Sequence, residues 1–121
     1  HLILRGGKNP NYDKDSVHAC VKCLSESNIN SNIMVDFSHG NSQKNHENQA
    51  KVCSSICSQI ANGNKNIVGV MIESNLQAGN QKISNQMEYG KSITDACVDF
   101  EETKVFLENL STAVQKRREI G

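Results

Sequence analysis

Three short apolar runs alternate with longer amphipathic segments along the chain. The apolar runs cover residues 2–4, 33–35 and 67–72, and each is followed by polar or glycine-rich sequence. Short runs bounded by turn residues are typical of buried β-strands. The third run is almost continuously apolar and β-branched, which favours a parallel strand covered on both faces. The pattern therefore predicts three strands.

A segment with helical spacing of apolar residues follows each predicted strand. The first begins near Asp13 and Asp15, which can cap a helix, and the second ends near Gly63. The third begins near residue 100 and closes with the cationic residues 116–118, which the helix dipole favours. The three apolar stripes are Val17, Cys20, Val21 and Leu24; Cys53, Ile56, Cys57 and Ile60; and Phe106, Leu110 and Val114. The predicted fold class is therefore α/β, with a strand and a helix repeated three times.

Polar side chains stand at or beyond the end of each predicted strand. They are Arg5 after the first strand, Asp36, Ser38 and His39 after the second, and Glu73 and Asp95 after the third. Because parallel connections bring the carboxyl ends of strands to one edge, we expect these side chains to lie close together. In an α/β barrel, that edge carries the active site.

Two kinds of ligand suit these residues. His39, Glu73 and Asp95 offer one nitrogen and two carboxylates, a donor set for a divalent metal ion such as Mn, Fe, Co or Zn. Arg5, beside Gly6 and Gly7, suits a phosphate or carboxylate, because guanidinium binds oxyanions bidentately. The residues alone leave a simpler interpretation open, in which the His bonds to its neighbours and the Arg lies on the surface.

Composition narrows the possible partners. The 121 residues include 13 basic and 13 acidic side chains, so the net charge of zero argues against a nucleic-acid or anionic-membrane partner. No apolar run approaches the roughly 20 residues of a membrane span. Only 36% of the residues are hydrophobic and Trp is absent, so the core is small. His1 lies against an apolar run, and we expect the chain to be one part of a larger protein.

Five cysteines, an odd number, favour a reduced, cytoplasmic chain over a disulfide framework. The spacing of Cys20 with Cys23 and of Cys53 with Cys57 is similar to that of a zinc module. However, three of these four residues fall on the apolar stripes of two helices, where free Cys behaves as a small hydrophobe. We therefore prefer core packing and keep zinc as an alternative.

Five segments resemble, in the same order, the type I 3-deoxy-D-arabino-heptulosonate-7-phosphate (DAHP) synthases. They are residues 3–7, 36–42, 69–74, 79–81 and 89–97. The resemblance runs the length of the chain, and the His-Gly-Asn-Ser motif is closer to the fungal branch of the family. It implies a (β/α)8 TIM barrel, of which residues 1–121 would be the C-terminal three βα units with strands 6–8, in a homo-oligomeric enzyme.

The same resemblance implies a reaction and a site. The family condenses phosphoenolpyruvate with erythrose 4-phosphate, giving DAHP and phosphate in the first step of the shikimate pathway, with a divalent metal. His39, Glu73 and Asp95 match three of its four metal ligands, and Arg5 matches an arginine that binds phosphoenolpyruvate. The fourth ligand, a cysteine, and the Lys-Pro-Arg-Thr segment that binds erythrose 4-phosphate have no counterpart in this chain.

Three other interpretations remain open. The related 3-deoxy-D-manno-octulosonate 8-phosphate synthase uses the same chemistry on arabinose 5-phosphate. A non-catalytic α/β binding module, or a truncated paralogue that associates with a full-length subunit, would need no complete site. The cysteine zinc module is the third.

The missing ligand and the missing strands predict that the isolated 121-residue chain is inactive and poorly folded, because three strands cannot close a barrel. We expect no metal-dependent phosphate release from the purified chain with both substrates, measured by a phosphate assay. Measurable release would contradict this prediction.

Overall fold

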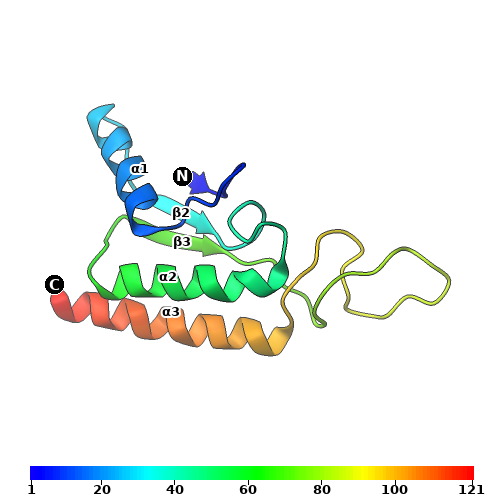
Figure 1. Cartoon of the computed structure of the whole chain (residues 1–121). Helices are drawn as coiled ribbons and strands as arrows, with labels where there is room; N and C mark the ends of the chain where they lie inside the picture. The colour runs from blue at the N-terminus through cyan, green and yellow to red at the C-terminus, as the bar shows by residue number, and fades with distance from the viewer.

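Three parallel strands and three helices make up the chain, and the computed structural model describes all of residues 1–121 (Figure 1). The strands are β1 (Leu2–Leu4), β2 (Ile33–Asp36) and β3 (Ile67–Met71). They form one sheet in the order β1-β2-β3, and both pairs are parallel. The three strands and their parallel direction, predicted from the apolar pattern, are confirmed.

The helices are α1 (Lys14–Glu26), α2 (Gln49–Ala61) and α3 (Phe100–Ile120), and the short 3-10 helix η1 (His46–Asn48) precedes α2. None of them is both long enough and apolar enough to cross a membrane. The strands and helices thus alternate along the chain as the hydrophobic pattern predicts.

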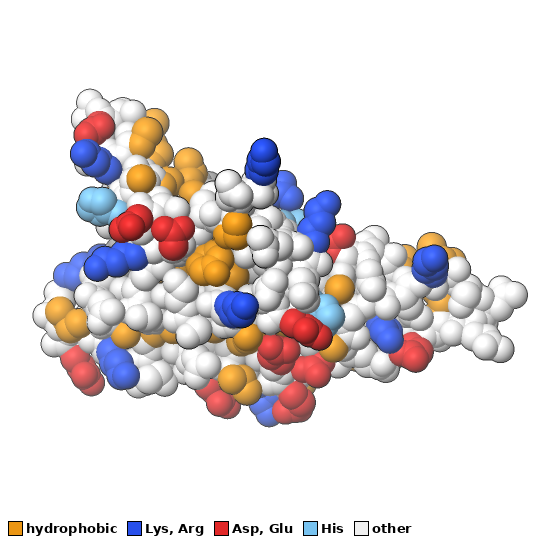
Figure 2. Space-filling view, in the orientation of Figure 1, with side chains coloured by type: hydrophobic (Ala, Val, Ile, Leu, Met, Phe, Trp, Pro, Cys, Tyr) orange, Lys and Arg blue, Asp and Glu red, His pale blue; other side chains and the backbone are white.

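Local sequence accounts for the helix ends. The carboxylate of Asp13 accepts a hydrogen bond from the amide of Ser16 at the start of α1. At the start of α3, the carboxylate of Asp99 accepts one from the amide of Glu102. Gly63 follows the C-cap of α2 with φ +105°, a conformation that glycine adopts without steric cost. Glu101 and Glu102 lie in the first turn of α3, where Figure 2 shows a group of acidic side chains. Arg117 and Arg118 lie in its last turn, and the helix dipole favours both placements.

Helices α2 and α3 lie side by side against one face of the sheet, whereas α1 lies apart from them (Figure 1). The core between these layers centres on Phe37, which is fully buried and meets Phe106 of α3 edge to face, with ring centroids 6.1 Å apart. The sheet contributes Leu4, Ile33, Val35 and Ile67, the helices contribute Val17, Leu24, Val52, Cys53, Ile56, Ile60 and Ala113, and Val98 completes the core.

The opposite face of the sheet is open. Ile3 is 41% exposed, Val68 48% and Met71 38%. No second layer of the chain packs on that face, so coverage of the third strand on both faces stays a prediction.

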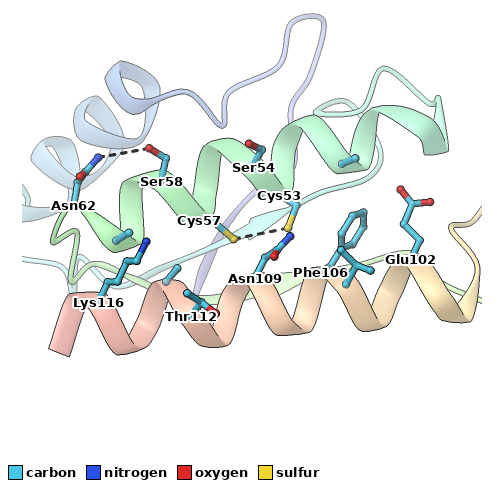
Figure 3. Close-up of a pocket in the computed structure, with 14 residues that line it drawn as sticks. Cys53, Ser54, Cys57, Ser58, Asn62, Glu102, Phe106, Asn109, Thr112 and Lys116 are labelled. Carbon is cyan, nitrogen blue, oxygen red and sulfur yellow. Dashed lines mark hydrogen bonds between the residues drawn. The ribbon is translucent and has the colours of Figure 1, made fainter. Parts of the chain in front are cut away.

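A groove of about 650 Å³ runs between α2 and α3 (Figure 3). Cys53 and Cys57 point into it from α2, with their Sγ atoms 3.8 Å apart. Burial, with the neighbouring thiol adding to it, raises the pKa of Cys53 to about 12, and burial raises the pKa of Cys57 as well. These thiols therefore stay protonated at neutral pH.

Core packing of Cys20, Cys53 and Cys57 is confirmed, since Cys53 is in the core and the other two pack against it.

Replacing Phe37 with Ala should reduce the free energy of unfolding by about 3–5 kcal/mol, because it removes the aromatic contact and leaves a cavity. Phe100→Ala is the matched control, since Phe100 is 54% exposed, and it should change stability by no more than about 0.5 kcal/mol. Urea unfolding of the full-length polypeptide, followed by circular dichroism, measures both. Equal losses for the two variants would mean that Phe37 does not anchor the core.

Candidate metal centre

The carboxyl edge of the sheet brings together His39, Glu73 and Asp95. His39 follows β2, Glu73 follows β3, and Asp95 lies in the loop before α3. The Nε2 atom of His39 lies 3.8 Å from Oε1 of Glu73 and 3.9 Å from Oδ2 of Asp95. Each residue offers one potential donor atom, and the three donor atoms all lie within 4.8 Å of one another. The three residues selected from the sequence thus lie close together.

Asp95 reaches this group although it is 22 positions beyond Glu73 in the sequence. The chain between them forms a long loop that extends away from the sheet and then returns to it (Figure 1). On the return, the amide of Val98 donates to the carbonyl of Glu73 over 3.0 Å, and Cys97 pairs with Gly79. Because Val98 is bonded beside Glu73, the carboxylate of Asp95 comes to lie next to that of Glu73.

Two buried side-chain amides hold the strand ends. Gln49, fully buried at the start of α2, donates to the carbonyl of Glu73 over 3.1 Å and accepts from its amide over 3.2 Å. Asn41 donates to the carbonyls of Leu4 and Asp36 over 3.1 and 2.8 Å. These amides satisfy backbone groups that the strands no longer pair, as buried backbone requires.

The imidazole of His39 has a close carboxylate neighbour. Its Nδ1 atom lies 2.7 Å from Oδ2 of Asp36, which is 2% exposed. The other oxygen of Asp36 accepts from the amide and the hydroxyl of Ser38 over 2.8 and 2.6 Å. His39 itself has φ +48°, an uncommon conformation for a residue with a side chain. With Nδ1 engaged, Nε2 is the ring atom that faces Glu73 and Asp95.

The electrostatics of this group favour a cation. Burial raises the pKa of Glu73 above its ordinary value, and the nearby carboxylates of Asp95 and Asp36 add to the rise. His39 opposes it. No Lys or Arg nitrogen lies within 4.0 Å of these three carboxylates, whose one ion-pair partner is His39.

The donor set and its spacing fit a divalent metal ion. Both distances from His39 Nε2 are shorter than twice a metal–ligand bond of about 2.0–2.2 Å, so one ion can reach both atoms of each pair. One imidazole and two carboxylates suit Mn, Fe, Co or Zn. No cysteine belongs to any group of three or more potential metal donors, so the structure gives the zinc module no support.

Arg5 lies at the same edge, directly after β1, and its side chain is exposed. It forms no ion pair with the three clustered residues, and its carbonyl accepts from the amide of Asn41 over 3.1 Å. The next residue, Gly6, has φ +75°, and a Cβ atom there would lie 2.5 Å from the nitrogen of Asn41. Glycine thus permits the close approach of the ends of β1 and β2.

Sequence reasoning named Asp36 and Ser38 at the strand end but assigned them no role, and it missed Gln49. A signal for Gln49 was present. It extends the apolar stripe of α2 by one turn, at the spacing of Cys53 and Ile56, so a polar residue there predicts a buried hydrogen bond.

The parallel strands, with metal-binding groups at their carboxyl edge, define an α/β protein with a candidate divalent-metal centre. Residues 1–108 match the family model described as the DAHP synthetase I family, and the chain belongs to that family.

Relatives from bacteria and a fungus agree with this assignment. The chain is 48% identical over 119 residues to the Trp-sensitive phospho-2-dehydro-3-deoxyheptonate aldolase of Salmonella typhimurium, covering 97% of this chain and 34% of the relative. It is 50% identical over 125 residues to the tyrosine-inhibited enzyme of Schizosaccharomyces pombe, covering 98% and 34%. A solved phospho-2-dehydro-3-deoxyheptonate aldolase from Francisella tularensis superposes with a TM-score of 0.91 at 52% identity, covering 97% of this chain and 35% of that chain.

The chain therefore spans about a third of the length of the curated relatives it matches. Identities of 48% to a bacterial relative and 50% to a fungal one do not separate the two branches. The closer similarity to the fungal branch stays a prediction.

Replacing Gly6 with Ala should reduce the free energy of unfolding by about 1–3 kcal/mol, because the new methyl group would overlap the backbone of residues 40 and 41. Gly7→Ala is the control: a Cβ atom there meets nothing within 4 Å, so stability should be unchanged or slightly higher. Urea unfolding of the two variants in the full-length polypeptide compares their stability. A Gly6→Ala variant as stable as Gly7→Ala would show that the strand ends do not need this contact.

Proposed function

We propose that this chain forms part of a DAHP synthase, which condenses phosphoenolpyruvate with erythrose 4-phosphate to give DAHP and phosphate. The observation that carries the proposal is the cluster of His39, Glu73 and Asp95 at the carboxyl edge of the sheet, in a chain of the DAHP synthetase I family. The names of the matched relatives, which are phospho-2-dehydro-3-deoxyheptonate aldolases, support the same reaction.

Residues 1–121 would then be the C-terminal three βα units of a single (β/α)8 barrel, with β1, β2 and β3 as strands 6–8. Two features of the sheet support this part of the proposal. Its outer strands β1 and β3 each pair on one side only, and unpaired strand edges invite further strands. Its open face carries the apolar side chains of Ile3 and Met71, which the rest of a closed barrel would cover.

In this proposal His39, Glu73 and Asp95 hold a divalent metal ion, and a cysteine from another part of the barrel is the fourth ligand. The imidazole contributes Nε2, since Nδ1 is engaged by Asp36, and each acid contributes a carboxylate oxygen. When bound, the ion supplies Lewis-acid chemistry, either polarising the aldehyde of erythrose 4-phosphate or activating the water that attacks C2 of phosphoenolpyruvate.

Arg5 binds the phosphate of phosphoenolpyruvate in this proposal. Its guanidinium group is exposed and has no carboxylate partner, so it is free to bind an anion. Water provides the oxygen at C2, and the phosphate leaves as inorganic phosphate. Because negative charge develops on that phosphate as it leaves, the guanidinium group of Arg5 stabilises the transition state more than the ground state.

The same proposal includes a cellular compartment and an oligomeric state for the enzyme. All five cysteines are free, which suits a reducing compartment such as the cytoplasm. The full barrel would assemble into a homo-oligomer, as the family resemblance implies.

Two rival functions can be separated from this one by assay. The octulosonate 8-phosphate synthase would release phosphate with arabinose 5-phosphate in place of erythrose 4-phosphate. A binding module would release none with either sugar. The full-length polypeptide should act on phosphoenolpyruvate and erythrose 4-phosphate.

In the full-length polypeptide, His39→Ala or Glu73→Ala should reduce metal-dependent phosphate release at least about 100-fold, the upper end of the loss seen when an outer-shell partner is removed. The reason is that each variant deletes a metal ligand. His18→Ala is the control, because His18 is exposed on α1, away from the cluster, and it should retain normal activity. Near-normal turnover in His39→Ala or Glu73→Ala would mean that the ligands are wrongly assigned.

A further inference from the structure

Asp36 is a buried carboxylate without a cationic Lys or Arg partner. It is 2% exposed, and the groups around it are the imidazole of His39 and the amide and hydroxyl of Ser38. Burying a carboxylate is costly unless every oxygen is hydrogen-bonded or paired. Its two oxygens are divided between two tasks: Oδ1 closes the turn at Ser38, and Oδ2 contacts Nδ1 of His39.

We propose that Asp36 is a positioning residue that holds His39 in the tautomer with its proton on Nδ1, leaving the lone pair of Nε2 directed at Glu73 and Asp95. This inference rests on the metal site of the proposed function. In a neutral imidazole, one nitrogen is a donor and the other an acceptor. A carboxylate oxygen 2.7 Å from Nδ1 can only accept, so Nδ1 carries the proton.

The backbone of His39 supports this role. Its φ of +48° is in the left-handed region, where a non-glycine residue needs compensating contacts. The bond from the Ser38 amide to Asp36 and the contact of Asp36 with the ring both span this turn. One carboxylate therefore fixes both the conformation of the chain that presents His39 and the direction in which its ring points.

Asp36→Asn separates these two tasks. The amide oxygen of Asn can still accept from the amide of Ser38, so the turn keeps its hydrogen bond. The amide nitrogen then faces Nδ1 of His39 and donates to it, so the ring proton moves to Nε2. An acid-to-amide change at such a position preserves geometry but selects the wrong tautomer. The proton on Nε2 would point at the carboxylates, where the ion has to bind.

Ser38→Ala is the matched control. It removes the hydroxyl that donates to Asp36 over 2.6 Å and lies 3.0 Å from Nδ1 of His39. It leaves the contact between Asp36 and His39 intact. If the hydroxyl instead of the carboxylate orients the ring, this variant will show the larger effect and overturn the proposal.

The experiment compares wild type, Asp36→Asn, Ser38→Ala and His39→Ala in the full-length polypeptide. Mn²⁺ affinity is measured by competition with a chelator, and the ¹⁵N shifts of the His39 ring are recorded in metal-free protein. We expect Asp36→Asn to weaken Mn²⁺ binding about 10–100-fold, the range for outer-shell partners of metal-binding His, and to move the ring proton from Nδ1 to Nε2. Ser38→Ala should retain the tautomer and most of the affinity.

The outcomes distinguish this inference from the proposed function. Loss of Mn²⁺ binding in His39→Ala, with wild-type affinity in folded Asp36→Asn, overturns the role of Asp36 and leaves the metal site standing. Equal Mn²⁺ affinity in wild type and His39→Ala overturns the metal site itself and the inference with it. If Asp36→Asn lowers stability in urea but its folded fraction keeps the tautomer and the affinity, Asp36 is only structural and the inference fails.

Discussion

The structure depends on the satisfaction of buried polar groups at the carboxyl edge of a three-stranded parallel sheet. Beyond the last ladder bonds, strand ends expose amides and carbonyls that cannot be left unpaired away from water. Asn41 bonds the carbonyls at the ends of β1 and β2, and Gln49 bonds both backbone groups of Glu73. These side chains replace backbone partners at the places where the site residues leave the sheet. The same bonds that complete the fold therefore position the candidate metal centre.

The rigidity of the site differs between its members. His39 and Glu73 stand next to buried bonds, whereas Asp95 lies at the end of a long loop and its side chain is 65% exposed. Side-chain amides hold this loop in shape: the side chain of Gln81, for example, donates to the carbonyls of Glu88 and Lys91. The candidate metal centre thus combines two donors that follow strands of the sheet with a third, more exposed donor on a returning loop.

The two faces of the sheet have opposite surroundings. One face packs on α2 and α3 around Phe37, and its residues are almost completely buried. The other carries apolar side chains that the chain itself leaves exposed. The chain spans about a third of the length of its curated relatives, and it covers 35% of the solved structure on which it superposes with a TM-score of 0.91.

The sequence by itself determined the elements and the candidate donors. Apolar spacing defined the strands and helices, because each element buries one face and its period is visible in the chain. Parallel connection then grouped His39, Glu73 and Asp95 at one edge. Only the tertiary structure decided which atoms face one another, that Asp36 contacts the ring of His39, and that Gln49 bonds Glu73. Those contacts join residues on different elements or on a turn with positive φ, and their geometry depends on packing that no local pattern encodes.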